Sequence, residues 1–156
     1  MENDRFTVGY DPEEIGPDQM LEAIQQLGFE PEIVAAKEAE PRREPTGPVP
    51  EPVASALAAA KREGKLVFLD FWAEWCAPCK ILEERTIADS RIQDFLSRQV
   101  FLRVDTDASP EAAQYFDAFA LPTIVVLSSE GGELFRQVGF IDAGALNDEL
   151  DKLRVR

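Results

Sequence analysis

Residues 68–80, FLDFWAEWCAPCK, decide the fold of this chain. The stretch begins inside the run 66–72, LVFLDFW, in which Asp70 is the only residue that is not apolar. This run is rich in aromatic and β-branched residues and is too short for an isolated core helix. It therefore predicts a strand covered on both faces, as in a parallel sheet. Pro78 suits the first turn of a helix, where its missing N–H costs nothing, so the strand is expected to lead into a helix.

Cys76 and Cys79 are the only two cysteines of the chain, and they lie where the predicted strand meets the predicted helix. At this spacing two side chains share one face of a helix turn, so the sulfurs can reach each other and close a disulfide. Cys76 would face unpaired N–H groups and the positive end of the helix dipole, which lower the pKa of a cysteine from about 8.5 to roughly 3.5–7.5. We therefore expect Cys76 to be the nucleophile and the more buried Cys79 to be the resolving thiol. Trp72 and Trp75 would form flat apolar walls beside the sulfurs.

A Cys-x-x-Cys pair can also be half of a zinc site. Four-coordinate zinc needs two more nitrogen or sulfur ligands, and the chain has no histidine and no third cysteine. Zinc or an iron–sulfur cluster would therefore need a second chain. A purely structural pair is disfavoured by its position between a strand and a helix. The pattern favours redox chemistry, and we expect no metal and no cofactor because the dithiol itself carries two electrons.

The segment 71–80, FWAEWCAPCK, resembles the active-site segment of thioredoxin, with Ala77 where a glycine is common. The order of motifs from about residue 51 onward also matches the thioredoxin superfamily. Residues 79–90 are more similar to the C-terminal thioredoxin-like domain of the bacterial transmembrane thiol:disulfide interchange proteins. The resemblance implies an α/β thioredoxin fold, with a central mixed sheet flanked by helices, and a thiol–disulfide oxidoreductase.

The rest of this domain alternates between helical and strand patterns. Predicted helices cover 52–63, 78–85, 109–119 and 142–153, and predicted strands cover 66–72, 100–105, 123–128 and 133–139. A break in the pattern is expected over 86–90, with Ser90 capping a short further helix and Asp142 capping the last one. We predict two parallel crossover units followed by a hairpin, and so a sheet with helices on both faces.

The N-terminal part has a different composition. A strand over 5–10, a helix over 20–27 and a strand over 29–35 resemble half of a heavy-metal-associated domain, namely the half without its metal-binding cysteines. About 35 residues are too few to bury a stable core alone. Five prolines then mark a semi-extended spacer. The expected division is a β-α-β half-module over 1–37, a linker over 38–52 and a thioredoxin-like domain over 53–156.

The resemblance also implies roles for residues around the cysteines. Asp70 occupies the position of a buried acid that moves protons to and from the inner cysteine, and burial beneath a dithiol should raise its pKa. Leu121 and Pro122 resemble the family's cis-proline element, which packs against the disulfide and offers backbone to an extended substrate. Gly139 and Phe140 fall in a loop that flanks the sulfurs, although Phe140 could equally be a core residue. The predicted catalytic residues are Cys76, Cys79, Asp70 and Pro122, and the predicted substrate contacts are Trp75, Ala77, Pro78, Leu121, Gly139 and Phe140.

A formal net charge of −14 argues against nucleic acid or an anionic membrane as a partner. No apolar run approaches 18 residues, so no membrane insertion is expected. Residues 1–30 lack the features of a signal peptide, and a complete chain would be cytoplasmic. The alternative is a soluble domain of a membrane-associated or exported protein. Glu83 and Glu84 are expected to be simply solvated, and we expect a monomer.

We therefore expect an enzyme that reduces protein disulfides, with a thioredoxin reductase or a membrane electron carrier as its donor. Two other classes stay open. The dithiol could hold Cu(I) in a metal-handling module. The fold could also serve as a scaffold, although that role would not require the cysteines, Asp70 and Pro122 together.

Overall fold

The computed structural model describes residues 16–26, 28, 30–31 and 47–154. The chain divides into two compact units, Met1–Glu44 and Pro45–Arg156, and each is described by itself. In the first unit, helix α1 (Pro17–Gln26) begins three residues before the predicted helix, because Pro17 suits a first helical position. The strand predicted over 5–10, and all but two residues of the strand predicted over 29–35, lie outside the described residues. None of the described helices has the length and apolar character needed to span a bilayer.

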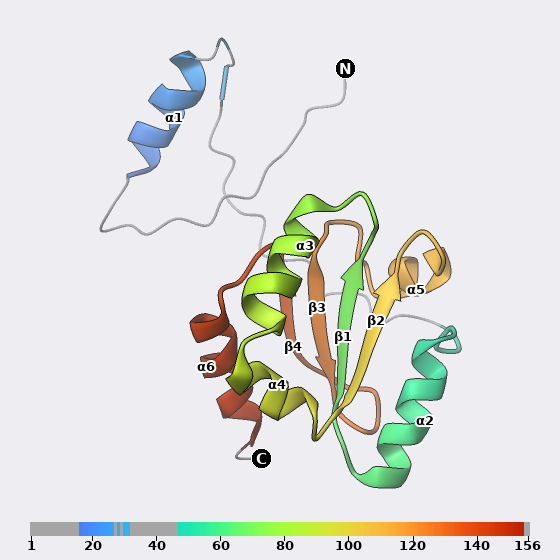
Figure 1. Ribbon diagram of the computed structural model, residues 1–156. Coiled ribbons are helices and arrows are strands. Elements are labelled where there is room, and N and C mark those ends of the chain that lie inside the picture. The colour runs from blue at the N-terminus through green and yellow to red at the C-terminus, as the bar shows by residue number, and fades with distance from the viewer. Residues whose placement is uncertain (1–15, 27, 29, 32–46, 155–156) are drawn as a thin grey trace. The chain divides into compact units, whose positions relative to one another are not determined.

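The second unit is built on a four-stranded sheet (Figure 1). Its strands are β1 (Val67–Trp72), β2 (Val100–Asp105), β3 (Thr123–Leu127) and β4 (Glu133–Val138). They lie in the order β2-β1-β3-β4, with β1 parallel to β2 and antiparallel to β3, and with β4 antiparallel to β3. The predicted mixed sheet is confirmed, and each strand lies within one residue of its predicted bounds.

One feature of the predicted topology is wrong. Two parallel crossover units were expected, but only the connection from β1 to β2 is one, since β3 runs antiparallel to β1. The reason is the length of α5 (Pro110–Tyr115), which has six residues and rises only about 9 Å. The preceding strand β2, also of six residues, rises about 20 Å. The short helix does not return the chain to the end of the sheet where β2 began, so β3 starts where β2 ends.

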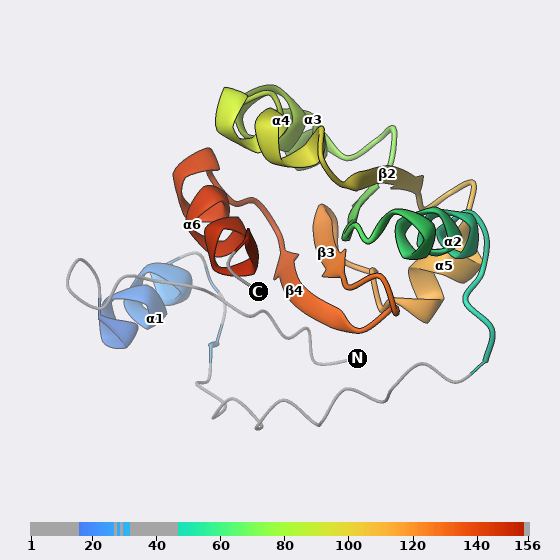
Figure 2. The same cartoon turned by 90° about the horizontal axis from the view of Figure 1, so that it is seen from below.

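Helices cover both faces of the sheet (Figure 2). On one face lie α2 (Val53–Glu63) and α5. On the other lie α3 (Ala77–Leu82), its continuation as the π-helix η1 (Glu83–Ile87), α4 (Ser90–Leu96) and α6 (Ala143–Arg154). This layering places β1 between two helical layers, as the apolar run in the sequence predicts.

The side chains of β1 alternate between two hydrophobic clusters. Val67, Leu69 and Phe71 pack in the cluster under α2 and α5, whereas Phe68 packs in the cluster under α3, α4 and α6. Because successive strand residues point to opposite faces, Asp70 shares the face of Phe68. The alternation therefore sets the one charged residue of β1 on the side of the helix that follows the cysteines.

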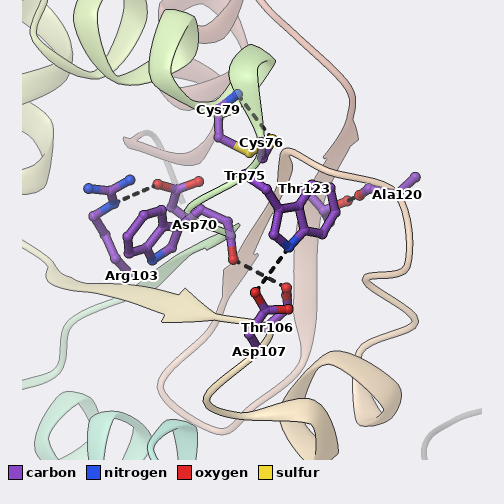
Figure 3. The surroundings of a disulfide bond; sticks show 10 residues. Asp70, Trp75, Cys76, Cys79, Arg103, Thr106, Asp107, Ala120 and Thr123 are labelled. Carbon is purple, nitrogen blue, oxygen red and sulfur yellow. Dashed lines mark hydrogen bonds and ion pairs between the residues drawn. A yellow bond between two sulfur atoms is a disulfide. The ribbon is translucent and has the colours of Figure 1, made fainter.

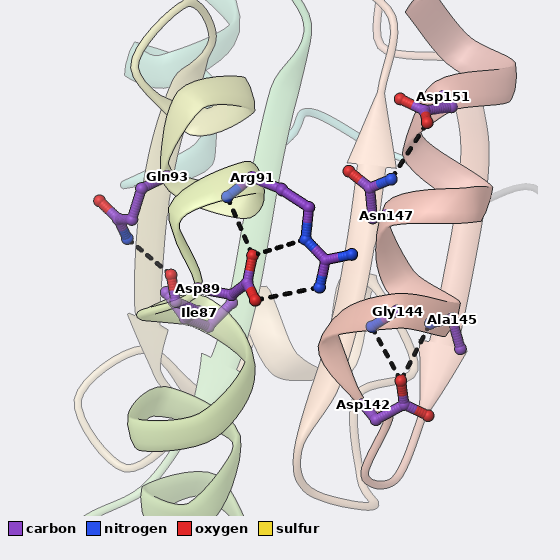
Figure 4. Close-up of polar contacts among 9 residues, drawn as sticks. All are labelled: Ile87, Asp89, Arg91, Gln93, Asp142, Gly144, Ala145, Asn147 and Asp151. Atoms are coloured by element: carbon purple, nitrogen blue, oxygen red, sulfur yellow. Dashed lines mark hydrogen bonds and ion pairs between the residues drawn. The ribbon is translucent and has the colours of Figure 1, made fainter.

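Helix ends differ from the predicted ones in three places. The helix that begins as α3 runs on through η1 to Ile87, two residues into the break expected over 86–90. Asp89 rather than Ser90 caps α4, with its carboxylate accepting from the N–H of Arg91 at 2.9 Å (Figure 4). Helix α5 ends at Tyr115, four residues early, because Asp117 has a left-handed φ of 50°. The predicted cap of α6 is confirmed, since Asp142 accepts from two N–H groups of its first turn at 2.8 and 3.0 Å.

Thr86 joins η1 to the loop after β4. Its side chain is fully buried, and its hydroxyl donates to the carbonyl oxygen of Ile141 at 2.6 Å. Thr106 makes a comparable bond to the carbonyl oxygen of Trp72 at 3.3 Å, but that oxygen also accepts the backbone N–H of Thr106 at 2.9 Å. The carbonyl oxygen of Ile141 therefore relies on the Thr86 hydroxyl for its hydrogen bond, whereas the carbonyl oxygen of Trp72 keeps a backbone donor without the Thr106 hydroxyl.

We expect Thr86→Val to lower the free energy of unfolding by about 1–3 kcal/mol, because it removes the donor from a part-buried carbonyl while nearly keeping the side-chain shape. Thr106→Val is the matched control and should change stability by no more than about 0.5 kcal/mol, since its acceptor keeps a second donor. Urea unfolding of both variants measures the difference. Equal losses in the two variants would contradict this account.

Candidate active site

Cys76 and Cys79 form a disulfide at the junction of β1 and α3 (Figure 3). The S–S distance is 2.04 Å and the two Cα atoms lie 5.3 Å apart. Cys76 is the N-cap residue of α3, and its Sγ accepts the backbone N–H of Cys79 at 3.2 Å. The predicted difference in burial between the cysteines is small, with exposed fractions of 3% for Cys76 and 2% for Cys79. Because both cysteines are almost fully buried, a partner must make close contact with the surface around them to reach either sulfur.

The position of Cys76 has a chemical consequence when the disulfide is open. A sulfur at a helix N-cap lies against the N–H groups that have no partner within the helix. A donor aimed at the sulfur stabilises negative charge on it more than it stabilises a neutral thiol. The geometry therefore favours Cys76 over Cys79 as the attacking thiolate.

Asp70 lies on β1, on the face that packs against α3. Its exposed fraction is 2%, so the residue is buried, as expected from the sequence. Oδ2 accepts from Nε of Arg103 at 3.0 Å, while the buried Oδ1 has no hydrogen-bond partner among the described residues. Burial raises the pKa of Asp70, as expected from the sequence, and the nearby Arg103 opposes this shift without cancelling it. The carboxyl group of Asp70 therefore keeps its proton to a higher pH than an ordinary aspartate does.

Arg103 is the centre of a charged network that the sequence analysis missed. It pairs directly with Asp70 in the parallel register of β1 and β2. Besides Asp70, it contacts Glu83 of η1, with Nη1 donating to Oε1 at 2.9 Å, and its guanidinium carbon lies 4.3 Å from the ring centroid of Trp72. Glu83, expected to be merely solvated, thus shares a guanidinium with the buried acid, and its negative charge helps raise the pKa of Asp70. The available signal was an arginine inside a strand predicted to lie beside the strand of Asp70.

Trp75 is 69% exposed, and its ring nitrogen donates to Oδ2 of Asp107 at 3.0 Å (Figure 3). The bond fixes one edge of the indole while leaving most of the ring open to a partner. Trp75 could be identified from the sequence, but Asp107 could not, because it follows β2 and has no local pattern to mark it. Lys80 lies 3.8 Å from Glu74, and both side chains are largely exposed, so this pair contributes little.

The predicted proline element lies beside the cysteines. The peptide bond between Leu121 and Pro122 is cis, and Leu121 packs against the small cluster formed by Cys76, Cys79 and Ala73. The carbonyl oxygen of Pro122 accepts the N–H of Gly139 at 2.8 Å, which joins the start of β3 to the loop after β4.

The predicted site residues therefore differ in accessibility. Trp75, Ala77, Pro78 and Phe140 are exposed, Leu121 and Gly139 are partly buried, and Cys76, Cys79, Asp70 and Pro122 are buried. Phe140 is 46% exposed, which disfavours the core role left open for it. Among the described residues, no three His, Cys, Asp or Glu side chains form a group that could hold a metal ion.

Comparison with known proteins gives consistent matches. Residues 50–129 match a family model described as thioredoxin-like. The thiol:disulfide interchange protein DsbD of Pseudoalteromonas atlantica is 36% identical over 95 residues, which are 57% of this chain and 16% of that protein. The chain therefore spans less than a fifth of the length of this relative.

Solved structures agree. A thioredoxin from Thermus thermophilus superposes with a TM-score of 0.59 at 27% identity, covering 65% of this chain and 82% of that one. The C-terminal domain of DsbD from Neisseria meningitidis, in its oxidised form, gives a TM-score of 0.54 at 26% identity over 64% of this chain and 90% of that domain. The fold around the cysteine pair is the thioredoxin fold, and the matches together with the pair support thiol–disulfide oxidoreductase chemistry.

We expect two substitutions to move the pKa of Asp70 in opposite directions. Arg103→Gln should raise it further, because both the charge and the hydrogen bond that oppose burial are lost. Glu83→Gln should lower it, because a negative charge that raises it is removed. The carboxyl carbon of Asp70, followed by NMR across a pH titration, gives the measurement. Shifts of the same sign in both variants would contradict the network.

The raised pKa of Asp70 also predicts how stability depends on pH. The native state binds this proton more tightly than the unfolded chain, so the contribution is fully present below the ordinary aspartate pKa of about 3.9 and is lost as pH rises through the raised value. Asp70→Asn has no such group. The stability of this variant minus that of the unmodified protein should therefore increase with pH across this window, measured by urea unfolding of the oxidised proteins. A difference that is flat or falls with pH would show that Asp70 does not titrate in this way.

Proposed function

The chain belongs to the thioredoxin-like family, and from that premise we propose that it reduces disulfides of other proteins with the dithiol of Cys76 and Cys79. One observation carries the proposal. The two cysteines are close enough to bond at the point where β1 leads into α3, with the cis bond before Pro122 beside them. A cysteine pair with a purely structural role would not need a buried aspartate, Asp70, on the face of β1 that packs against α3.

The reaction would proceed in two exchange steps. The thiolate of Cys76 attacks one sulfur of the target disulfide, the target S–S bond breaks, and its other sulfur leaves and takes up a proton. The thiol of Cys79 then loses its proton and attacks Sγ of Cys76, which releases the remaining target sulfur. Two electrons have passed to the target, and the Cys76–Cys79 disulfide has formed. A dithiol reductant restores the starting state.

The residues around the pair would serve these steps differently. Asp70 would take the proton from Cys79 in the second step, since its raised pKa brings it closer to that of a thiol. Arg103 would hold the carboxylate of Asp70 in place and limit the rise of its pKa. The backbone of Leu121 would pair with an extended segment of the target, and Trp75 and Phe140 would contact its side chains.

The wider setting follows from this chemistry. The partners would be proteins with accessible disulfides and a reductase or membrane electron donor that returns the pair to the dithiol. A cytoplasmic location fits a chain whose cysteines form one redox pair with none left for a structural bond, and a domain of a membrane-associated or exported protein is the alternative. The monomeric state and the division at residues 38–52 remain predictions.

We expect Cys79→Ser to stop turnover after the first step, because the mixed disulfide on Cys76 is no longer resolved. In an assay of insulin disulfide reduction driven by dithiothreitol, its rate should fall to the uncatalysed level. When the reduced variant is freed of dithiothreitol and then mixed with insulin, a covalent adduct should accumulate and appear on a non-reducing gel, where mass spectrometry identifies the attached chain.

Cys76→Ser provides the matched control. It should abolish both turnover and the adduct, since the attacking sulfur is gone. If the unmodified protein reduced no protein disulfide, or if Cys76→Ser kept full activity, the proposed function would be refuted.

A further inference from the structure

The sheet topology brings four loops to the same end of the sheet as the disulfide, which we call the site end. Trp72 of β1 pairs with Asp105 of β2, Phe71 pairs with Thr123 of β3, and Thr123 pairs with Val138 of β4. The parallel strands β1 and β2 therefore finish where β3 begins and β4 finishes (Figure 1). The loops at this end are residues 73–76, 106–109, 116–122 and 139–142.

Each of these four loops carries one carboxylate and no lysine or arginine. The four acidic residues are Glu74, Asp107, Asp117 and Asp142, and all four are exposed. Asp107 accepts from the ring nitrogen of Trp75, and Asp142 caps α6, so N–H groups hold both carboxylates in place. Asp142 also interacts electrostatically with Arg91 of α4. The nearby Lys80 contacts Glu74 at 3.8 Å, and Arg103 is engaged by Asp70 and Glu83.

Three of the same loops also carry an exposed aromatic residue. Trp75 is 69% exposed, Phe119 is 73% exposed and Phe140 is 46% exposed. Exposed apolar side chains grouped at a reactive centre indicate a surface that a partner covers. Negative charge and aromatic faces together attract one kind of side chain in particular, because lysine and arginine form ion pairs with carboxylates and stack on aromatic rings.

We propose that the site end selects cationic target segments, in which a lysine or arginine flanks the cysteine that Cys76 attacks. The inference rests on the proposed function and names its substrate class. The exposed carboxylates would attract the segment, and the basic side chain would lie between a carboxylate and an aromatic face. A target with acidic residues beside its cysteine would be repelled at the same positions.

Two cyclic octapeptides provide the test. Each is closed by one disulfide, and they differ in having lysine or glutamate beside the cysteines. The rate at which the reduced protein opens each peptide is measured by chemical quench and chromatography. Each rate is divided by the rate with dithiothreitol, which corrects for the intrinsic reactivity of the peptide.

We expect the lysine peptide to react about tenfold faster than the glutamate peptide at low salt, within the range of electrostatically steered association. The ratio should fall towards one in 1 M salt, where the screening length is about 3 Å. Equal rates for the two peptides at low salt, or a faster glutamate peptide, would overturn the inference while leaving the proposed function intact. If neither peptide were opened, both would fail.

A pair of double variants separates the local surface from the overall charge of the chain. Glu74→Gln with Asp117→Asn removes two carboxylates at the site end, and asparagine tolerates the left-handed φ at position 117. Glu63→Gln with Glu130→Gln removes two exposed carboxylates elsewhere, at the last residue of α2 and in the hairpin between β3 and β4. Both variants have the same net charge. The lysine-to-glutamate rate ratio should fall at least about threefold in the first variant and stay unchanged in the second. Equal falls in both would overturn the inference.

Discussion

The constraint on which this site depends is a carboxylate buried between the central strand of the sheet and the helices that cover it. Asp70 sits on β1, which has a helical layer on each side, so water cannot stabilise its charge. The compensating group must come from a neighbouring strand, and Arg103 lies opposite Asp70 in the register of β1 and β2. A slip of one residue in β2 would turn Arg103 to the other face and leave the acid without a cation. The electrostatic surroundings of Asp70 are therefore fixed by strand pairing.

Much of this arrangement could be predicted because it is written in local patterns. The run 66–72, the proline between the cysteines and the apolar periods of the later segments give the strands to within one residue. The cis bond before Pro122 followed from family resemblance, since no local pattern distinguishes it. The direction of β3 was not predictable in the same way, because it depends on how far a short helix carries the chain in space.

The charged network shows a second limit of sequence. Glu83 and Arg103 are each ordinary in their own segments, and their roles appear only in the fold, where the side chain of Arg103 on β2 reaches that of Glu83 on η1. Asp107 likewise acquires a role from its distance to Trp75. Pairwise contacts between segments far apart in the chain have no periodic signal. The cysteines and Asp70, in contrast, are exceptional within one short stretch.

The placement of the two tryptophans has a practical consequence. The chain contains two, and both lie beside the disulfide, Trp72 under the guanidinium of Arg103 and Trp75 bonded to Asp107. Their indole emission therefore comes from the immediate surroundings of the sulfurs, with no third indole to dilute it. The molecule contains its own optical probe, and binding, opening and closing of the sulfur pair can be followed in real time without attaching a dye.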